Sequence, residues 1–577
     1  MKNYKRIKNK RWFIQKPDEA LQELFVRELG IYPLTAQLLI NRGISDIESA
    51  FCFLSPELKN LHNPFLMKDM DKAVVRIIEA LQKNENIVIY GDYDVDGTTA
   101  TSILYLFLKE IGANVSYYIP ERLKEGYGLN KPALEGLYKN GAKIIITTDC
   151  GISNYDEVLF ANSLGWDVII TDHHEVPSRV PPAFAVLNPK QSDCNFPFKE
   201  LAGVGVAFNL IMALRSRLRG NGYFANGEPN LKNYLDLVAL GTIADMVPLV
   251  DENRIFARSG LELLSSAARP GIKALKDVSR VSNGSTTSGH VSFQLAPRIN
   301  AAGRLEKADT SVKLMTADNP DEALRLAREL DRENSARQNI ESEILNEAVG
   351  IIEDYLKRNN LDNAIVLASE KWHQGVIGVV ASRLVDMYYR PTILISISGE
   401  IGKGSGRGIR GFHILEGLQA CSQYLEKFGG HKAAAGLNIN KGNVLAFRDA
   451  FLKFASKLKE DDLIPRLSID APVHLDELNE NVVREIDSLA PFGLGNTEPI
   501  LCAKDVQIIQ SQVVGTNHLR FKTTQKNRIF NAIAFGFGDM HPIDGKYMDM
   551  AFTPCVEEWN GNKDLKLNVK GLKEVGH

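Results

Sequence analysis

The chain of 577 residues has few cysteines, and no two of them are spaced as a C-x-x-C pair. The six cysteines are widely scattered, which excludes a disulfide scaffold or a zinc knuckle. No apolar run reaches the roughly eighteen residues that cross a membrane, and the basic start of the chain lacks the apolar segment of a secretory signal. We therefore expect a cytoplasmic protein with no membrane partner.

An excess of positive charge is also missing. Lys plus Arg number 68 against 71 Asp plus Glu, so the net charge is −3. This balance excludes a uniformly basic nucleic-acid coat, and any contact with nucleic acid requires local positive charge. Hydrophobic residues make up 44% of the chain, which is ordinary for folded soluble domains. At about 150 residues per domain, the length predicts roughly three or four domains.

Short apolar segments alternate with helical patterns between residues 86 and 172. NIVIYGD, KIIITTD and WDVIITD are apolar, β-branched segments, and each of the first two is followed by a stretch with helical periodicity. Strands that alternate with helices at this spacing predict an α/β fold with a doubly wound parallel sheet. Strands that are apolar throughout predict that helices cover both faces of this sheet.

The predicted secondary-structure pattern changes twice in the rest of the chain. Residues 319–358 have apolar residues at helical spacing and predict one long helix or two nearly continuous ones. A second α/β pattern follows, and after about residue 461 short β segments predict a small barrel. The predicted regions are an amino-terminal helical segment (1–75), the parallel-sheet domain (76–318), the connecting helix (319–358), an α/β domain (359–460) and a β-barrel domain (461–577).

Acidic residues stand at the ends of the predicted strands. They are Asp92, Asp94 and Asp96 after the first strand, Asp149 after the second, Asp172 before His173 and His174 after the third, and Asp245 after the apolar stretch LDLVAL, which we also expect to be a strand. Because parallel strands bring their carboxyl ends to one edge of a sheet, we expect these four clusters to converge.

Carboxylates gathered at an apolar edge repel one another unless cations neutralise them. Carboxylate oxygens with imidazole nitrogen suit Mn²⁺ or Mg²⁺, and there are enough ligands for two ions that share one carboxylate. Such a pair activates water and stabilises charge on a phosphoryl oxygen. A single aspartate after a strand is most often a helix N-cap, and His-His alone is more often a surface feature. Acidic residues at the ends of four predicted strands are hard to explain by capping alone, which favours the interpretation as a metal site.

These residues also carry a family resemblance. GDYDVDG, TTDCGIS, TDHH and GTIADMVPL stand in the order and spacing of the four motifs of the DHH phosphoesterase superfamily. The segments IPERLKEGYGLN, LAGVGVAFNL and APRINAAGRL resemble the RecJ family of 5′→3′ exonucleases specific for single-stranded DNA. The resemblance extends from about residue 86 onward. It implies a DHH domain, a DHHA1 domain and an OB-like domain that binds single strands.

The resemblance implies a role for individual residues. The metal ligands are Asp94, Asp96, Asp149, His173 and Asp245, and the catalytic residues are Asp149, as the bridging carboxylate, and His174, which faces the scissile phosphate. Asp172 is expected to orient a neighbouring histidine. The sequence departs from the superfamily at Tyr90, where many members have a ligand histidine. Asp92 can compensate, because residues i and i+2 of an extended segment share a face.

The glycine-rich stretch 402–411 lies between a predicted strand and a helix that the sequence predicts over residues 413–430. It can be read as a flexible loop, as a dinucleotide-binding fingerprint or as a nest of backbone N–H groups that binds an anion. The fingerprint is weak, because FGGHKAAAG follows in place of a strand that ends in an acid. The resemblance favours phosphate binding. The implied phosphate and DNA contacts are Arg122, Arg298, Arg304, Ser405, Arg407 and His431.

The sequence therefore predicts a two-metal 5′→3′ exonuclease that degrades single-stranded DNA to 5′-mononucleotides in DNA repair and recombination. One alternative is a phosphodiesterase of cyclic dinucleotides or short oligonucleotides, against which the added β domain argues. The other is a non-catalytic nucleic-acid-binding scaffold, against which the complete acid set argues. We expect two Mn²⁺ or Mg²⁺ ions as cofactors, single-stranded DNA as the partner and a monomeric state. The sequence does not predict protein partners.

Overall fold

The computed structural model describes residues 10–122, 124–224, 227–281, 284–305, 309–526, 528–559 and 562–575. The chain forms two compact units. The parallel-sheet unit consists of residues Glu48–Ala336 and Leu489–Thr497, and the barrel unit of residues Met1–Ile47, Arg337–Ser488 and Glu498–His577. Each is described by itself. None of the helices in the described part of the chain is long and apolar enough to cross a bilayer.

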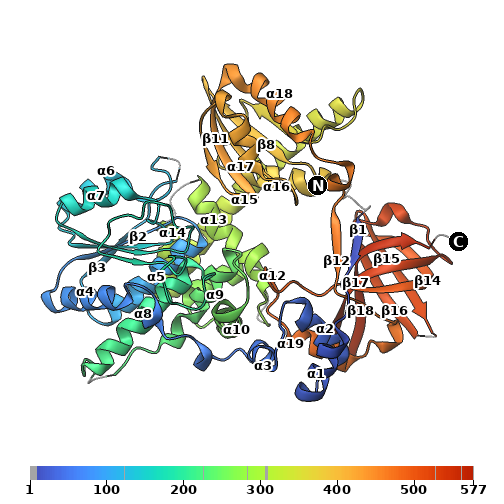
Figure 1. Ribbon diagram of the computed structural model, residues 1–577, viewed down its shortest axis with the longest axis horizontal. Helices are drawn as coiled ribbons and strands as arrows, with labels where there is room; N and C mark the ends of the chain where they lie inside the picture. Colours follow the sequence, from blue (N-terminus) through green and yellow to red (C-terminus); the bar gives the residue numbers. More distant parts are fainter. Residues whose placement is uncertain are drawn as a thin grey trace. The chain divides into compact units, whose positions relative to one another are not determined.

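In the parallel-sheet unit, of which Figure 1 labels β2 and β3, five parallel strands form a sheet in the order β3-β2-β4-β5-β6. Their bounds are β2 Ile87–Gly91, β3 Val115–Tyr118, β4 Ile144–Thr148, β5 Asp167–Thr171 and β6 Ala185–Leu187. Ile87 and Ile89 point into a core cluster with helices α4 (Met70–Lys83), α5 (Val95–Glu110) and α8 (Gly203–Gly220). Val88 and Tyr90 point into a second cluster with helices α6 (Lys131–Lys139) and α7 (Tyr155–Ser163). Both faces of the sheet are therefore covered, which explains why these strands are apolar throughout.

The helices of this unit surround the sheet. Their bounds are α3 Ile47–Leu54, α4 Met70–Lys83, α5 Val95–Glu110, α6 Lys131–Lys139, α7 Tyr155–Ser163, α8 Gly203–Gly220, α9 Leu235–Ala244, α10 Asp251–Ser266, α11 Pro270–Ser279, α12 Ser288–His290, α13 Ala296–Leu305 and α14 Asp309–Thr316. A π-helical turn at Val291–Leu295 joins α12 to α13.

The expectation of a fourth strand before Asp245 was wrong, because residues 235–244 form helix α9. Residues 235–243 of this helix are all buried, so its sequence has no polar face. A helix that is buried all round shows no periodicity of 3.6 residues, and its short apolar run cannot be distinguished from a buried strand.

A helix of 37 residues, α15 (Pro320–Leu356), begins in the parallel-sheet unit and ends in the barrel unit. The side chain of Asn319 accepts hydrogen bonds from the N–H groups of Asp321 and Glu322 and so caps its first turn. The predicted long helix is confirmed.

The barrel unit contains a mixed sheet in the order β10-β11-β9-β8-β7. The bounds are β7 Ile365–Ser369, α16 Ile377–Tyr388, β8 Thr392–Ser398, β9 Ile401–Arg407, α17 Ile414–Ala420, β10 Leu425–Gly430, β11 Ala434–Asn440 and α18 Val444–Ala455. The expectation of a glycine-rich loop was wrong for residues 401–407, which form the central strand β9. A Cβ at Gly402 would lie 2.9 Å from side-chain atoms of Ile395 and Ile439, so the glycine lets these neighbours pack over the strand. The predicted helix over 413–430 is also shorter and gives way to β10.

The carboxy-terminal strands close into a barrel. Strand β14 pairs with both β15 and β17, and the circle continues through β16 and β18. The bounds are β14 Leu501–Val514, β15 His518–Gln525, β16 Arg528–Phe535, β17 Tyr547–Trp559 and β18 Asn562–Glu574. The remaining elements of this unit are β1 Arg11–Ile14, α1 Glu19–Leu29, α2 Pro33–Asn41, β12 Arg466–Ile469, β13 Ala471–Pro472 and α19 Glu480–Ser488. Strand β1 pairs in parallel with β12. The amino-terminal segment therefore contains a strand, whereas the sequence predicts helices there.

Candidate metal centre

Three strands of the parallel sheet end level with one another. Gly91 of β2 lies opposite Thr148 of β4, which lies opposite Thr171 of β5. The next residue of each strand is an aspartate: Asp92, Asp149 or Asp172. The sheet register therefore brings three acidic side chains to one edge, as the sequence predicts. The backbone of Asp149 has a φ of 60°, which is uncommon for a residue other than glycine and frequent at functional sites.

Helix α5 adds two further acids to this edge. Asp94 is its N-cap and accepts a hydrogen bond from the N–H of Gly97 at 3.0 Å. Asp96 lies in the first turn, and its carboxylate accepts hydrogen bonds from the N–H groups of Gly203 (2.6 Å) and Val204 (2.8 Å) at the start of α8. The amino-terminal ends of two helices thus stabilise negative charge here.

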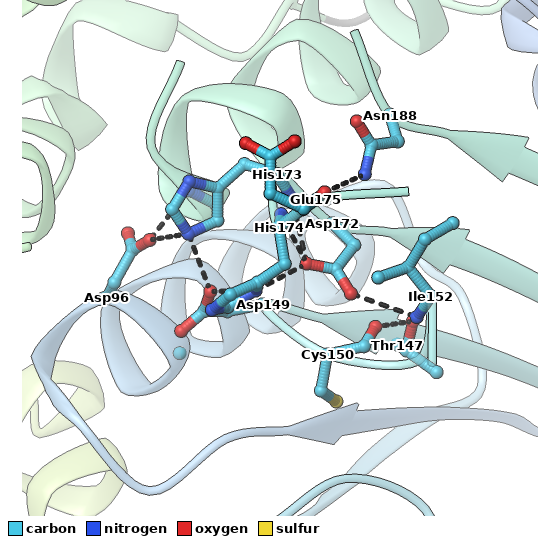
Figure 2. A network of polar contacts seen from close by, with 12 residues as sticks. Asp96, Thr147, Asp149, Cys150, Ile152, Asp172, His173, His174, Glu175 and Asn188 are labelled. Atoms are coloured by element: carbon cyan, nitrogen blue, oxygen red, sulfur yellow. Dashed lines mark hydrogen bonds and ion pairs between the residues drawn. The ribbon is translucent and has the colours of Figure 1, made fainter. Parts of the chain in front are cut away.

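The remaining acid, Asp245, follows the last residue of α9. It joins the strand-end residues around His173. The Nε2 atom of His173 lies 3.2 Å from Asp149 Oδ1 and 3.8 Å from Asp96 Oδ2 (Figure 2). The same atom lies 3.5 Å from Asp245 Oδ2. Asp245 therefore follows a helix and not a strand as expected. The four acid clusters nevertheless converge as predicted.

Asp172 faces away from this group and orients the second histidine. One oxygen of its carboxylate lies 2.8 Å from His174 Nδ1 and accepts the backbone N–H groups of His173 and His174 (Figure 2). The other oxygen accepts the N–H of Ile152 at 2.9 Å. Burial opposes the charged carboxylate, yet these hydrogen bonds and the histidines lower the pKa of Asp172. The hydrogen bond with Asp172 likewise raises the pKa of His174 against the effect of burial.

Ligand atoms of these residues form three groups close enough to hold a metal ion. Within each group the atoms lie within 4.8 Å of one another. The groups are Asp149, His173 and His174; Asp96, His173 and Asp245; and Asp92, Asp94 and Asp149. Asp149 and His173 each belong to two of them. Asp92 takes part in the third group, whereas the hydroxyl of Tyr90 donates to the carbonyl of Gly128.

The protonation energetics of the site fit a bound cation. Burial, followed by neighbouring carboxylates, raises the pKa of Asp96 to about 7 and that of Asp245 to about 9. Burial lowers the pKa of His173 to about 3, so its imidazole is neutral and keeps a lone pair. Within the described residues, Asp149 Oδ1 and His173 Nε2 are buried and have no hydrogen-bond partner. Buried acids that repel one another, next to an imidazole nitrogen without a hydrogen-bond partner, suit Mn²⁺ or Mg²⁺.

A cavity of about 310 Å³ opens beside these acids. Its lining combines carboxylates, His174 and two arginines: Asp92, Tyr93, Asp94, Arg122, Tyr127, Asp149, His174, Asn300 and Arg304. The guanidinium of Arg122 lies 5.0 Å from the centroid of the Tyr93 ring, which supports it from one side. Cation-binding groups and positive charge therefore lie around one space of the size of a small ligand.

The other predicted phosphate contacts lie elsewhere. Arg298 is on α13 with Arg304, but it pairs with Asp331 at 2.9 Å and does not line the cavity. Ser405 and Arg407 are on β9, where Arg407 Nη1 donates to Ser405 Oγ at 3.1 Å and Nε donates to Ser382 Oγ at 3.1 Å. His431 follows β10 and is exposed. These three residues belong to the barrel unit.

Besides Tyr93, the cavity residues Tyr127 and Asn300 were missed from the sequence. The hydroxyl of Tyr127 donates to the backbone carbonyl of Asp149 at 3.0 Å and lies 3.2 Å from His174 Nδ1. The side chain of Asn300 accepts the N–H of Val95 at 3.2 Å and so connects α13 to the start of α5. Both lie in segments that carry the family resemblance, GYGLN and INAAGR, which was the only signal for them.

Comparisons with known proteins agree with this architecture. Three family models match: the DHH family, N-terminal domain, over residues 86–242; the DHHA1 domain over 361–458; and the RecJ OB domain over 469–571. The chain is 40% identical over 568 residues to the single-stranded-DNA-specific exonuclease RecJ of Bacillus subtilis, which covers 97% of this chain and 70% of that protein. It is 37% identical to the protein of the same name from Haemophilus influenzae, over 94% of this chain and 96% of that protein.

The chain belongs to the RecJ family. The crystal structure of RecJ from Thermus thermophilus in complex with Mn²⁺ superposes with a TM-score of 0.84 at 29% identity, over 98% of this chain and 80% of that one. A second structure of that RecJ contains Mg²⁺. The predicted α/β fold, with DHH, DHHA1 and OB-type barrel domains in this order, is confirmed for this RecJ-family chain. The assignment of individual site residues and the predicted domain boundaries stay predictions.

Proposed function

We propose that the protein is a metal-dependent 5′→3′ exonuclease that degrades single-stranded DNA to 5′-mononucleotides in DNA repair and recombination. The observation that carries the proposal is the cavity in which Asp94 and Asp149 lie with Arg122 and Arg304. Carboxylates that hold cations and guanidinium groups that bind phosphate are the two requirements of phosphodiester hydrolysis. The names of the relatives at 40% and 37% identity support single-stranded DNA as the substrate.

The proposed metal ligands are Asp94, Asp96, Asp149, His173 and Asp245, with Asp92 as a further carboxylate beside the first of them. Two Mn²⁺ or Mg²⁺ ions held there would supply Lewis acidity, which neutralises the phosphodiester and acidifies water. The crystal structures of the Thermus relative with either ion support this choice. A monomeric state remains part of the proposal.

The chain's own residues would bind and orient the substrate. Arg122 and Arg304 line the cavity and would bind the oxygens of the scissile phosphodiester. His174 donates to Asp172 from Nδ1, and in its protonated form, which the raised pKa favours, it would also donate a hydrogen bond to the same phosphate from Nε2. Ser405, Arg407 and His431 are proposed phosphate contacts of the barrel unit, and Arg298 is proposed to act indirectly, through the position of α13.

A nuclease assay tests the function. Single-stranded DNA labelled at the 5′ or 3′ end, blunt duplex DNA and a cyclic dinucleotide are incubated with the protein and Mn²⁺ or Mg²⁺. We expect early release of labelled mononucleotide from the 5′ end of single strands only. Cleavage of the cyclic dinucleotide alone would favour the small phosphodiesterase, and no cleavage of any substrate would favour the scaffold.

The variant Asp149→Asn tests the metal assignment in the same assay. We expect a loss of about 10³-fold or more, because a bound cation contributes several kcal/mol to stabilising the transition state. Asp193→Asn is the control, since Asp193 is an exposed aspartate that pairs with Lys68. An Asp149→Asn protein with normal turnover would contradict the assignment.

A further inference from the structure

A short segment of the carboxy-terminal part of the chain belongs to the parallel-sheet unit. Residues Leu489–Thr497 cluster with this unit, although the residues before and after them belong to the barrel unit. The segment contains a tight turn, in which Gly493 and Asn496 exchange two backbone hydrogen bonds of 2.8 and 3.2 Å. We call residues 489–497 the docking segment.

The side chain of Asn496 holds the docking segment in shape. It is fully buried, and its Nδ2 donates to the carbonyls of Leu489 at 2.8 Å and Pro491 at 2.9 Å. Burying an amide is favourable only when its hydrogen bonds are made, so these two bonds fix the path of the backbone across the turn.

The docking segment is anchored to three elements of the parallel-sheet unit. The carbonyl of Ala490 accepts hydrogen bonds from Arg254 and Arg258 of α10, both at 3.1 Å. The carbonyl of Phe492 accepts the hydroxyl of Ser288, the first residue of α12, at 2.5 Å. The third contact is made with the loop between α9 and α10.

This third contact is made with residues 248 and 249, shortly after the proposed metal ligand Asp245. The N–H of Leu249 donates to the carbonyl of Leu494 at 2.7 Å. A Cβ at Gly493 would lie 2.7 Å from Leu249 Cδ1, and a Cβ at Gly495 would lie 3.0 Å from Pro248 Cβ. The two glycines therefore let the turn lie against residues 248 and 249 without an intervening side chain.

The contacted loop is continuous with Asp245. Asp245 directly follows α9 as its C-cap, and the next residue, Met246, turns the chain with a φ of 60°. On its other side the loop is held by Asn253, whose Nδ2 donates to the carbonyl of Pro248 at 3.0 Å. Residues 248 and 249 thus lie between α10 and the docking segment, and their position constrains the path of the backbone that leads from Asp245.

We propose that the docking segment positions Asp245 through its contact with residues 248 and 249. This contact would then determine how tightly the group formed by Asp96, His173 and Asp245 binds a divalent cation. The inference rests on the proposed metal-dependent function and adds a part of the chain that supplies no ligand. Supporting residues of metal sites typically change metal affinity by about 10- to 100-fold when removed.

The test is calorimetric titration of the full chain with Mn²⁺, compared with its thermal unfolding in EDTA. The first variant is Asn496→Ala. The second, Arg258→Gln combined with Ser288→Ala, releases two anchors of the docking segment and leaves its own side chains in place. The control is Asn363→Ala, which removes an amide that also donates to two carbonyls, those of Ala455 and Leu458, in the barrel unit.

We expect both docking-segment variants to bind one of two Mn²⁺ ions about tenfold more weakly or worse, with Asn363→Ala unchanged. Their exonuclease activity should recover when Mn²⁺ is raised, which loss of folded protein would not permit. Wild-type affinity at both sites in a folded Asn496→Ala protein, or in the double variant if Asn496→Ala does not fold, would overturn the inference. A wild-type chain that binds no Mn²⁺ would instead contradict the proposed function itself.

Discussion

At the scale of single residues, the candidate metal centre is a set of buried acids that repel one another unless a cation neutralises them. Burial and mutual repulsion raise the pKa of Asp96, Asp149 and Asp245. The fold opposes this repulsion at one residue by directing the N–H groups of Gly203 and Val204 to Asp96. Asp172 differs from the others, because its hydrogen bonds lower its pKa and keep it charged beside His174.

Tyr127→Phe tests whether the hydroxyl of Tyr127 positions the catalytic groups. The change removes the hydrogen bond to the carbonyl of Asp149 and the contact with His174 Nδ1, and it leaves the ring in place. We expect turnover to fall about tenfold, in the range found for outer partners of metal sites. Tyr223→Phe is the control, because the Tyr223 hydroxyl also donates to a carbonyl, that of Ile111, outside the cavity. Equal activity of the two variants would assign Tyr127 a packing role only.

Glu252 predicts a pH dependence of stability outside the metal centre. It is fully buried on α10, and burial raises its pKa to about 7. The folded protein therefore binds more protons than the unfolded chain between about pH 4.5 and 7, so this residue's contribution to stability is complete below that window and is lost as the pH rises through it.

We expect Glu252→Gln to remove this dependence, because glutamine stays neutral and still accepts the N–H of His62. Relative to wild type, the variant's free energy of unfolding should rise by up to about 3 kcal/mol between pH 5 and pH 8. Urea unfolding in EDTA at both pH values measures the difference. Glu57→Gln, at an exposed pair with Lys59, should show none. A difference independent of pH would refute the assignment.

At the scale of elements, close helix packing depends on glycine at one crossing. Gly260 of α10 faces α9, and a Cβ there would lie 2.1 Å from the carbonyl oxygen of Leu235 and 2.4 Å from Ala239 Cβ. Since Asp245 directly follows α9, the position of α9 at this crossing also determines where Asp245 lies relative to the strand ends. A methyl group at Gly260 would force the two helices apart.

Gly260→Ala should therefore destabilise the protein by at least about 2 kcal/mol, as overpacking does. Gly350→Ala is the matched control in α15, because a Cβ at Gly350 meets nothing within 4 Å. An alanine there should stabilise the helix by about 0.5 to 1 kcal/mol. Chemical unfolding of both variants measures the difference, and a neutral Gly260→Ala would show that α9 and α10 shift without cost.

The elements also show where sequence periodicity is informative. The strands of the parallel sheet were predicted from their continuous apolar runs, and helix α15 from a long series of apolar residues at helical spacing. Helix α9 and strand β9 were misassigned for opposite reasons. The first has no polar face because it is buried all round, and the second has glycines where neighbouring side chains fill the space above the strand.

At the scale of the whole molecule, metal binding should stabilise one unit selectively. All proposed ligands lie in the parallel-sheet unit, and a ligand at 100 times its Kd stabilises the form that binds it by about 2.7 kcal/mol. We expect saturating Mn²⁺ to slow amide hydrogen exchange at the carboxyl ends of β2, β4 and β5 by about tenfold or more. Exchange in β8 and β9 of the barrel unit should not change. Equal protection of both sheets, or none, would contradict this.

By itself, the sequence determined the strand-end acids, the order of the domains and the family. These are local or ordered properties: an apolar run followed by an aspartate is read along the chain, and parallel strands place their carboxyl ends together. Only the tertiary structure decided that Asp245 comes from a helix, that Tyr127 contacts Asp149 and His174, and that residues 489–497 lie against the loop after Asp245. Such contacts join residues far apart in the chain, and packing selects them through shape and hydrogen bonds that no single segment encodes.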